Sequence, residues 1–296
     1  MKFITGVTAA VYRYNPGIIA QAFASLDVLY PGRIGLGVGS GEAMNEVPLG
    51  FDWPSAEIRV ERTIEAIQII NKLWIRNDNK SRDSEPAFTN DSKTDATYDS
   101  TIDNDGFVTF VGKYFKIKNA KLYTPPSTDI PLYMAGSGQQ AIKAAAKYTD
   151  GLITTSKPPE VREIFDIFDN AAKGVDKNPD SLQKIAKPKV SYSEDYDKAF
   201  KSCEFWRTTQ IEDAFNTSIS DPRILEQKAQ EVSDDEQKKS TIIVTSIEDL
   251  ISPIEKYFHA GFTRLYIHST SPDEIEFIRL FAKKVLPYFH GKWKKK

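Results

Sequence analysis

The chain is poor in the residues that build several common kinds of site. Among its 296 residues, Cys203 is the only cysteine, which excludes an intrachain disulfide and zinc sites made of three or four cysteines. A lone cysteine is typical of a reducing compartment, so we expect a cytoplasmic protein. The three histidines, His259, His268 and His290, have no carboxylate at metal-binding spacing, and we predict no metal site. The sequence has no G-x-S-x-G elbow and offers no support for acyl transfer.

The chain has neither an excess of one charge nor a long apolar run. The 39 basic and 41 acidic residues give a formal net charge of −2, whereas a nucleic-acid-binding protein would show a basic footprint. No apolar run reaches the length of a transmembrane helix, so we expect no membrane partner. The apolar start superficially resembles a signal peptide. Because Arg13 to Pro16 follow at once without a cleavage pattern, we interpret it as a core strand.

Short apolar runs rich in β-formers alternate with amphipathic stretches along most of the chain. We predict strands at residues 3–7, 33–39, 132–135, 151–155, 189–192, 241–244 and 264–267. The predicted helices cover residues 16–29, 56–74, 139–148, 159–172, 196–206, 247–259 and 272–285. Strands that alternate with helices indicate parallel βαβ units. About six or seven such units can be counted, whereas a closed (β/α)8 barrel needs eight.

One stretch interrupts the alternation. Residues 77–106 are rich in Asp, Ser, Asn, Lys and Thr and nearly free of aliphatic side chains, which predicts a disordered surface insertion. Residues 107–115 then show the alternation and the Gly-Lys turn of a hairpin. Residues 207–240 are polar and helix-prone. Nothing in the sequence indicates a second domain, so we expect a single barrel domain over residues 1–296.

A glycine-rich segment runs from Gly35, inside the second predicted strand, to Glu46. It does not fit the dinucleotide fingerprint, because counting from Gly37 the third glycine would fall at Glu42. Glycines at the carboxyl end of a strand let backbone amides approach a flat or anionic cofactor, beside the carboxylate of Glu42 and the amide of Asn45. A tight βα turn whose polar residues only cap a helix is an equally acceptable interpretation.

Two later strand ends carry polar side chains before a helix. Gly136-Ser-Gly138 would expose helix amides to a phosphate, or would be an ordinary glycine-containing loop. Thr155 and Lys157 suit an anionic substrate group, or a capped helix start with an exposed lysine. His268 follows the last predicted strand and is either functional or a buried, hydrogen-bonded side chain.

Short motifs fill the first 46 residues: Arg13-Tyr-Asn-Pro16, Ala20-Gln-Ala-Phe-Ala24, Leu29-Tyr-Pro-Gly-Arg33 and Gly37 to Glu46. Together they resemble the coenzyme F420-dependent glucose-6-phosphate dehydrogenase family of the luciferase-like superfamily. A weaker likeness continues to the C-terminus outside residues 77–106. The resemblance implies an α/β fold, a (β/α)8 TIM barrel of luciferase-like type. It also implies that the first two βα units of that barrel, which bring an Asp-His pair and a Trp to the site, are missing from this chain.

The resemblance assigns roles to matching positions. Gly6 and Val7 match a strand end where the family has a non-prolyl cis peptide, and Glu42 matches the catalytic acid–base carboxylate. Thr155 and Lys157, the latter with a one-residue offset, match substrate-binding positions. The positions that match cofactor-binding residues are Gly6, Val7, Ser40, Gly41, Asn45, Ser137, Gly138, Gln140 and Ala141.

The sequence departs from the sugar-phosphate dehydrogenases at the substrate. A lysine of the family's phosphate site falls at Asn216, the histidine that neighbours this lysine falls at Thr217, and the arginine of the site falls near Thr241. Losing these cations removes charge-assisted contacts, so we expect a substrate other than glucose 6-phosphate.

The resemblance therefore implies hydride transfer between the deazaflavin coenzyme F420 and a small-molecule alcohol or carbonyl substrate. An FMN-dependent luciferase-like monooxygenase and an inactive truncated fragment or binding protein are the alternatives. Barrels of this superfamily also make a homodimer one possible state.

Overall fold

The computed structural model describes residues 1–75 and 99–292. Its internal contacts divide the chain into two compact units, which are described separately. Unit 1 comprises Met1–Gly41, Pro54–Ile153 and Ile164–Gln183, and unit 2 comprises Glu42–Trp53, Thr154–Glu163 and Lys184–Lys296. Whether residues 1–296 behave as a single domain stays a prediction.

Unit 1 is built on parallel strands. β1 (Phe3–Ile4), β3 (Ile34–Gly39), β7 (Leu132–Ala135) and β8 (Gly151–Thr154) are neighbours in that order, and β2 (Thr8–Ala9) pairs with the end of β3. All six residues of β3 are buried, as expected for a parallel strand that is covered on both faces. The predicted parallel arrangement is confirmed here by the registers Leu36↔Leu132 and Met134↔Leu152.

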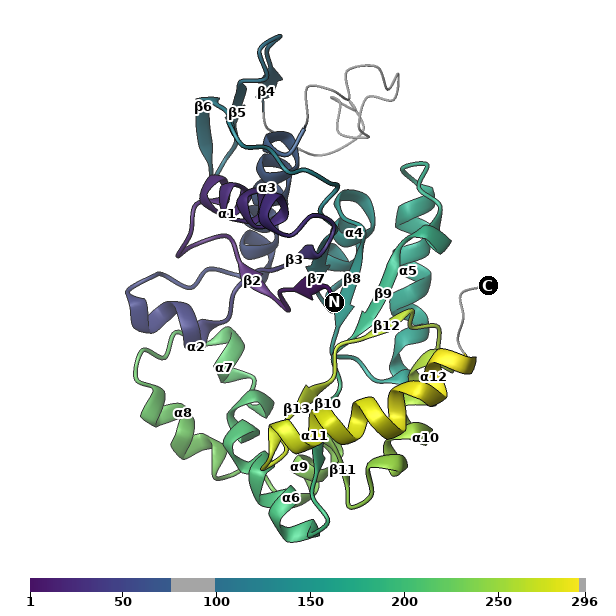
Figure 1. The fold of residues 1–296 in the computed structure, drawn as a ribbon. Helices are drawn as coiled ribbons and strands as arrows, with labels where there is room; N and C mark the ends of the chain where they lie inside the picture. The colour runs from purple at the N-terminus through teal and green to yellow at the C-terminus, as the bar shows by residue number, and fades with distance from the viewer. Residues whose placement is uncertain (76–98, 293–296) are drawn as a thin grey trace. The chain divides into compact units, whose positions relative to one another are not determined.

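Helices of unit 1 pack around α3, which can be followed in Figure 1. α1 (Pro16–Leu29) begins with a proline in its first turn, and the Asn15 side chain caps it by accepting a hydrogen bond from the Gly17 amide at 2.9 Å. α3 (Ala56–Leu73) begins after Ser55, whose side chain accepts from the Ile58 amide. α3 packs against both α1 and α4 (Gln139–Tyr148). Most of α5 (Val161–Lys173) also belongs to this unit.

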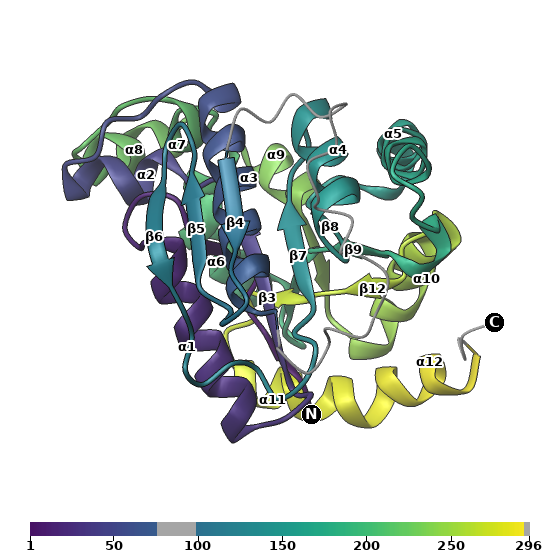
Figure 2. The same cartoon turned by 90° about the horizontal axis from the view of Figure 1, so that it is seen from above.

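An antiparallel sheet lies beside α3 in Figure 2. It consists of β4 (Asp99–Ile102), β5 (Val108–Val111) and β6 (Lys116–Ala120). The hairpin predicted at 107–115 is confirmed. The insertion predicted at 77–106 was wrong for residues 99–106, which form β4 and the turn to β5, because backbone pairing with β5 orders a polar strand. Residues 77–98 lie outside the described residues.

Unit 2 contains two further sets of parallel strands. β10 (Lys189–Tyr192) lies between β11 (Thr241–Val244) and β13 (His268–Ser269), and β9 (Gln183–Ala186) pairs with β12 (Arg264–Leu265). Only residues 264–265 of the strand predicted at 264–267 form a strand, β12, and β13 begins after the predicted range. β9 was not predicted. Val190, Ile247, Leu250 and Ile254 are buried in the core of this unit.

Helices make up most of the remainder of unit 2. Side-chain caps start four of them, at Asp195, Asp221, Ser233 and Asp273. The helical segments are α2 (Ala43–Glu46), α6 (Tyr196–Cys203), α7 (Asp213–Asn216), α8 (Pro222–Ala229), α9 (Asp234–Ser240), α10 (Ile251–His259), α11 (Glu274–Leu280), the π-helical segment η7 (Phe281–Val285), α12 (Leu286–Lys292) and the 3-10 segments η1 (Val47–Leu49), η3 (Pro158–Glu160), η5 (Glu204–Gln210) and η6 (Ile247–Leu250).

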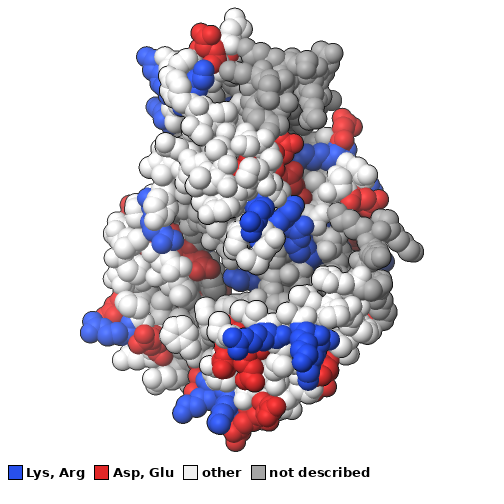
Figure 3. Space-filling model, in the orientation of Figure 1, with Lys and Arg blue, Asp and Glu red and all other residues white. Residues whose placement is uncertain are grey.

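Charges of both signs are interspersed on the face shown in Figure 3, in keeping with the net charge of −2. Among the described residues, no helix combines the length and the apolar character needed to cross a membrane.

Candidate functional site

The peptide bond between Gly6 and Val7, in the short link from β1 to β2, is cis. The cis bond expected from the resemblance is therefore confirmed. The Thr5 side chain supports this link, since its hydroxyl donates to the Gly37 carbonyl and accepts from the Gly37 amide, both at 3.1 Å. The link between the two strands is thereby fixed to the middle of β3.

The glycines of β3 make room for this link. A Cβ atom on Gly37 would lie 2.2 Å from the Thr5 carbonyl oxygen, and one on Gly39 would lie 2.7 Å from a methyl group of Val7. Since real Cβ atoms do not come so close, both positions require glycine. These glycines thus serve close packing of the chain on β3, which differs from the close approach to a cofactor that we expected. Val7 itself keeps 42% of its surface exposed.

Two of the predicted cofactor-binding loops of unit 1 lie at one edge of its sheet. Ser40 and Gly41 follow β3, and residues 136–138 follow β7, its parallel neighbour. Because the carboxyl ends of parallel strands share an edge, the structure brings these loops together with Val7, which packs at Gly39.

The loop after β7 presents the start of α4. Ser137, Gly138 and Gln140 are exposed, and Ala141 is buried. Gly138 is the N-cap of α4 and supplies no capping side chain, and a Cβ atom placed on it would meet nothing within 4 Å. The first amides of a helix attract anions, so this loop fits a phosphate group.

Glu42 and Asn45 belong to unit 2 and touch each other. Both are exposed, and the Asn45 Nδ2 atom donates to Glu42 Oε2 at 2.7 Å. Glu42 is also the N-cap of α2, and its carbonyl accepts from the amides of Asn45 and Glu46. The side chain of Asn45 can therefore orient the carboxylate of Glu42.

Thr155 and Lys157 occupy the link that follows β8. Thr155 is exposed, and the Lys157 ammonium donates to the backbone carbonyl of Lys239. Lys157 is thus directed towards the residues just before β11.

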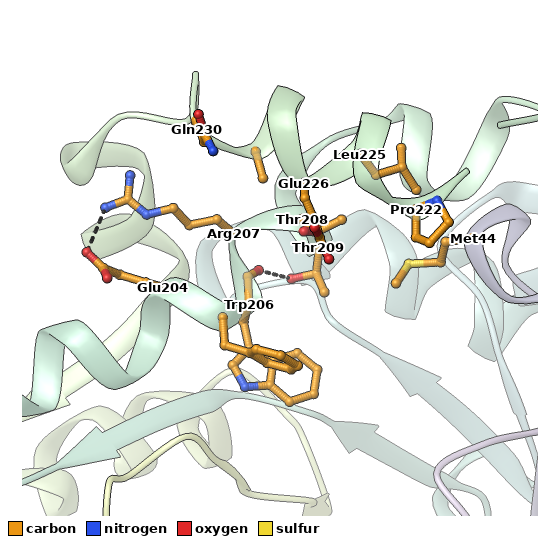
Figure 4. Close-up of a pocket in the computed structure, with 12 residues that line it drawn as sticks. Met44, Glu204, Trp206, Arg207, Thr208, Thr209, Pro222, Leu225, Glu226 and Gln230 are labelled. Carbon is orange, nitrogen blue, oxygen red and sulfur yellow. Dashed lines mark hydrogen bonds and ion pairs between the residues drawn. The ribbon is translucent and has the colours of Figure 1, made fainter. Parts of the chain in front are cut away.

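A pocket of about 660 Å³ opens in unit 2 between η5 and α8. Its wall is largely apolar and includes Met44, Trp206, Pro222 and Leu225, which Figure 4 shows. Phe205, which also lines the pocket, is 83% exposed. Such a pocket can take the apolar part of a small molecule.

A family model described as luciferase-like monooxygenase matches residues 1–264. The chain belongs to this luciferase-like family. The recognition made from the sequence is confirmed, and the fold is the family's α/β fold with parallel strands. How many βα units its barrel has is left as a prediction.

Among curated relatives of this luciferase-like chain, the F420-dependent glucose-6-phosphate dehydrogenase of Microbacterium testaceum (strain StLB037) is 32% identical over 286 residues, covering 96% of this chain and 76% of the relative. The enzyme of the same name from Mycolicibacterium gilvum (strain PYR-GCK) is 30% identical, covering 96% and 77%.

Among solved structures, an F420-dependent secondary alcohol dehydrogenase in complex with an F420-acetone adduct superposes with a TM-score of 0.81 at 32% identity, covering 97% of this chain and 79% of that one. The F420-dependent tetrahydromethanopterin reductase of Methanopyrus kandleri superposes with a TM-score of 0.69 at 19% identity, covering 98% of this chain and 83% of that one. At this low identity the similarity supports only a common fold.

The sequence did not single out Lys187 and Lys189 of unit 2 as candidate site residues, and it left the role of His268 undecided. Lys187 and Lys189 carried no motif, and His268 was an open candidate. Burial lowers the pKa of His268, and the nearby charges of Lys187 and Lys189 lower it further. The signal available in the sequence was a lysine, Lys189, at the first position of a predicted strand.

The described residues contain no group of three or more His, Cys, Asp or Glu side chains able to hold a metal ion. The absence of a metal from this luciferase-like chain stays a prediction.

Proposed function

We propose that this chain is an oxidoreductase that transfers a hydride between the deazaflavin coenzyme F420 and an alcohol or carbonyl substrate. The observation that carries the proposal is the superposition, at a TM-score of 0.81 and 32% identity, on the F420-dependent secondary alcohol dehydrogenase with its F420-acetone adduct. The F420-dependent dehydrogenases among the curated relatives support the same cofactor.

The residues of unit 1 fit such a cofactor. Gly6, Val7, Ser40 and Gly41 would border its ring, and the loop from Ser137 to Ala141 would hold its phosphate tail. The exposed, uncapped start of α4 supports the second assignment, since its amides can donate to phosphate oxygens. When bound, F420 supplies a ring carbon that accepts or donates the hydride.

Glu42 is the proposed acid–base group. Its Oε2 atom accepts the hydrogen bond from Asn45, which leaves Oε1 to hold a proton for a nitrogen atom of the cofactor ring. Asn45 acts by fixing the carboxylate orientation. Because the carboxylate is exposed, it can exchange its proton with water between turnovers.

The proposed substrate is not glucose 6-phosphate. Thr155 and Lys157 remain the proposed substrate contacts, but the resemblance puts a lysine of the sugar-phosphate dehydrogenases at Asn216, the histidine beside it at Thr217, and their arginine near Thr241. Asn216 and Thr217 bind Glu212 and Asp213 respectively, and Thr241 is buried at the start of β11.

The test compares F420 with FMN. We expect fluorescence titration to give tight F420 binding and weak FMN binding. Tight FMN binding without F420 binding would overturn the cofactor, and oxygen consumption with reduced FMN would establish the monooxygenase alternative. Binding of neither cofactor would leave the inactive fragment or binding protein.

The role of Glu42 is tested by Glu42→Gln. We expect F420 affinity to stay within about threefold and hydride transfer to fall by about 10²–10⁴, because general acid–base catalysis contributes that factor. Glu57→Gln, which changes an exposed carboxylate in the first turn of α3, is the matched control and should leave both unchanged. An unchanged rate in Glu42→Gln would remove Glu42 from the mechanism.

Three finer statements remain proposals. The fold is of the luciferase-like (β/α)8 barrel type, which a crystal structure of the protein tests. The protein is cytoplasmic, which fractionation tests, and it forms a homodimer, which light scattering tests.

A further inference from the structure

Two strand breaks lie side by side in unit 2. β9 ends at Ala186 and β10 begins at Lys189, while β12 ends at Leu265 and β13 begins at His268. The backbone amide of His268 donates to the Pro188 carbonyl at 2.9 Å, so the two breaks are joined directly. Lys187 stands in the first break, and its amide donates to the Thr154 carbonyl at the end of β8. The backbone that carries Lys187, Lys189 and His268 is therefore joined at one place.

Lys189 and His268 present their side chains on the same face. They are register partners in the parallel pair of β10 and β13, and paired residues of neighbouring strands point to one side of a sheet. Lys189 Nζ donates to Thr209 Oγ1 at 2.7 Å. The Trp206 ring stands edge-on to the His268 ring, with 4.4 Å between the centroids.

The charges around Lys189 and His268 are mostly of one sign. Burial lowers the pKa of Lys189, the Cys203 thiol opposes this effect, and Lys157 and Lys187 lower the pKa further. Within the described part of the chain, no carboxylate is among the groups that shift the pKa of Lys189 or of His268. Holding like charges together in a half-buried place costs free energy, which a bound anion offsets.

The same place borders the apolar pocket. Trp206 and Thr209, which contact His268 and Lys189, are also lining residues of the 660 Å³ pocket between η5 and α8 (Figure 4). A molecule whose anionic group binds at the basic side chains would have its apolar part beside Trp206, Leu225 and Met44.

We propose that Lys157, Lys187, Lys189 and His268 bind the phosphate or carboxylate group of an organic anion whose apolar part occupies the adjoining pocket. The identification of this anion as the substrate rests on the proposed function, and it narrows that substrate to an anionic alcohol or carbonyl compound. The binding of the anion itself does not depend on F420.

The test measures the pKa of His268 by NMR with and without inorganic phosphate, on the whole chain without cofactor. The chain has three histidines, so the signal that is lost in His268→Gln is assigned to His268. We expect phosphate to raise the pKa of His268, because a bound anion offsets the lysine charges that lower it. Acetate in a second arm separates a carboxylate site from a phosphate site, and a rise with either anion supports the proposal.

The variants assign the effect to the cluster. In Lys189→Met we expect phosphate to bind at least about tenfold more weakly, since a charge-assisted contact is lost. Lys157→Met, in the loop after β8, is a second variant with the same expected direction. The control is Lys198→Met, whose ammonium lies 4.0 Å from Asp195 and is 73% exposed, and it should bind phosphate as the unchanged protein does.

The proposal is overturned if neither anion moves the pKa of His268, or if Lys198→Met weakens binding as much as Lys189→Met. Phosphate binding without any F420 binding would contradict the proposed function and support the anion site. F420 binding without an effect of either anion would support the proposed function and contradict the anion site.

Discussion

At the scale of single residues, Gln68 is the least satisfied side chain of α3. It is 1% exposed, and neither atom of its amide has a hydrogen-bond partner within the described structure. Its neighbours Ile67, Ile69 and Ile70 are fully buried. An unpaired buried amide costs free energy that an apolar side chain of similar length does not.

We therefore expect Gln68→Met to raise the free energy of unfolding by about 1–2 kcal/mol. Urea denaturation of the two proteins measures it. Gln227→Met, at an exposed position of α8, should stay within about 0.5 kcal/mol of the original. A loss of stability in Gln68→Met would mean that the amide has a partner, such as a bound water.

Some features of the candidate site could be predicted from the sequence, and others could not. The cis peptide at Gly6–Val7 followed from the likeness of neighbouring motifs, which are local in sequence. The grouping of Lys189 with His268 could not be predicted, because it depends on the register between strands 79 positions apart. Register is set by packing across the whole sheet, and no short motif encodes it.

At the scale of elements, one carboxylate holds the β5–β6 hairpin against α3. Glu65 is 8% exposed, and its two oxygens accept the backbone amides of Lys113, Tyr114 and Phe115 at 2.8, 3.0 and 3.0 Å. The Arg62 guanidinium, one turn earlier on α3, lies over the Tyr114 and Phe115 rings. The turn thus depends on a charge that is supplied from 48 residues away.

In Glu65→Gln, one acceptor oxygen becomes an NH2 group that faces backbone donors. We expect the free energy of unfolding to fall by about 2–3 kcal/mol, measured by guanidinium denaturation. Glu61→Gln is the control, because Glu61 meets Lys113 and Tyr114 at the surface, where ion pairs contribute little. Equal losses in both variants would show that the carboxylate of Glu65 is not what holds the turn.

Elements with a strong local pattern were predicted to the residue. α1, β7, α4 and β11 have the bounds that the sequence indicated. β4 was not predicted, since most of its residues are exposed and polar and it exists through its ladder with β5. β9 was not predicted because only its last two residues, Ile185 and Ala186, are apolar and buried, whereas Gln183 and Lys184 are polar. Two apolar residues do not form a recognisable strand pattern. A strand that forms mainly through pairing with its neighbours cannot be recognised from its own amino-acid composition.

At the scale of the whole molecule, the chain passes repeatedly between the two units. Each unit consists of three separate segments, and the boundaries fall inside single elements: α5 is divided after Glu163, β8 after Ile153 and β9 after Gln183. A helix or strand forms cooperatively, so an element shared by two units cannot fold in one and unfold in the other without losing its own stability.

We therefore expect both units to unfold in one transition. Tryptophan fluorescence can follow each of them, because Trp74 of unit 1 donates to the Ala20 carbonyl and Trp53 of unit 2 donates to the Phe215 carbonyl. Two variants, each keeping one of these tryptophans and carrying Phe at the other three positions, should show the same urea midpoint within error. Far-ultraviolet circular dichroism on both variants controls for stability changes caused by the substitutions. Midpoints that differ between Trp74 and Trp53, with identical circular dichroism curves, would mean that the units unfold independently and that the shared elements do not couple them.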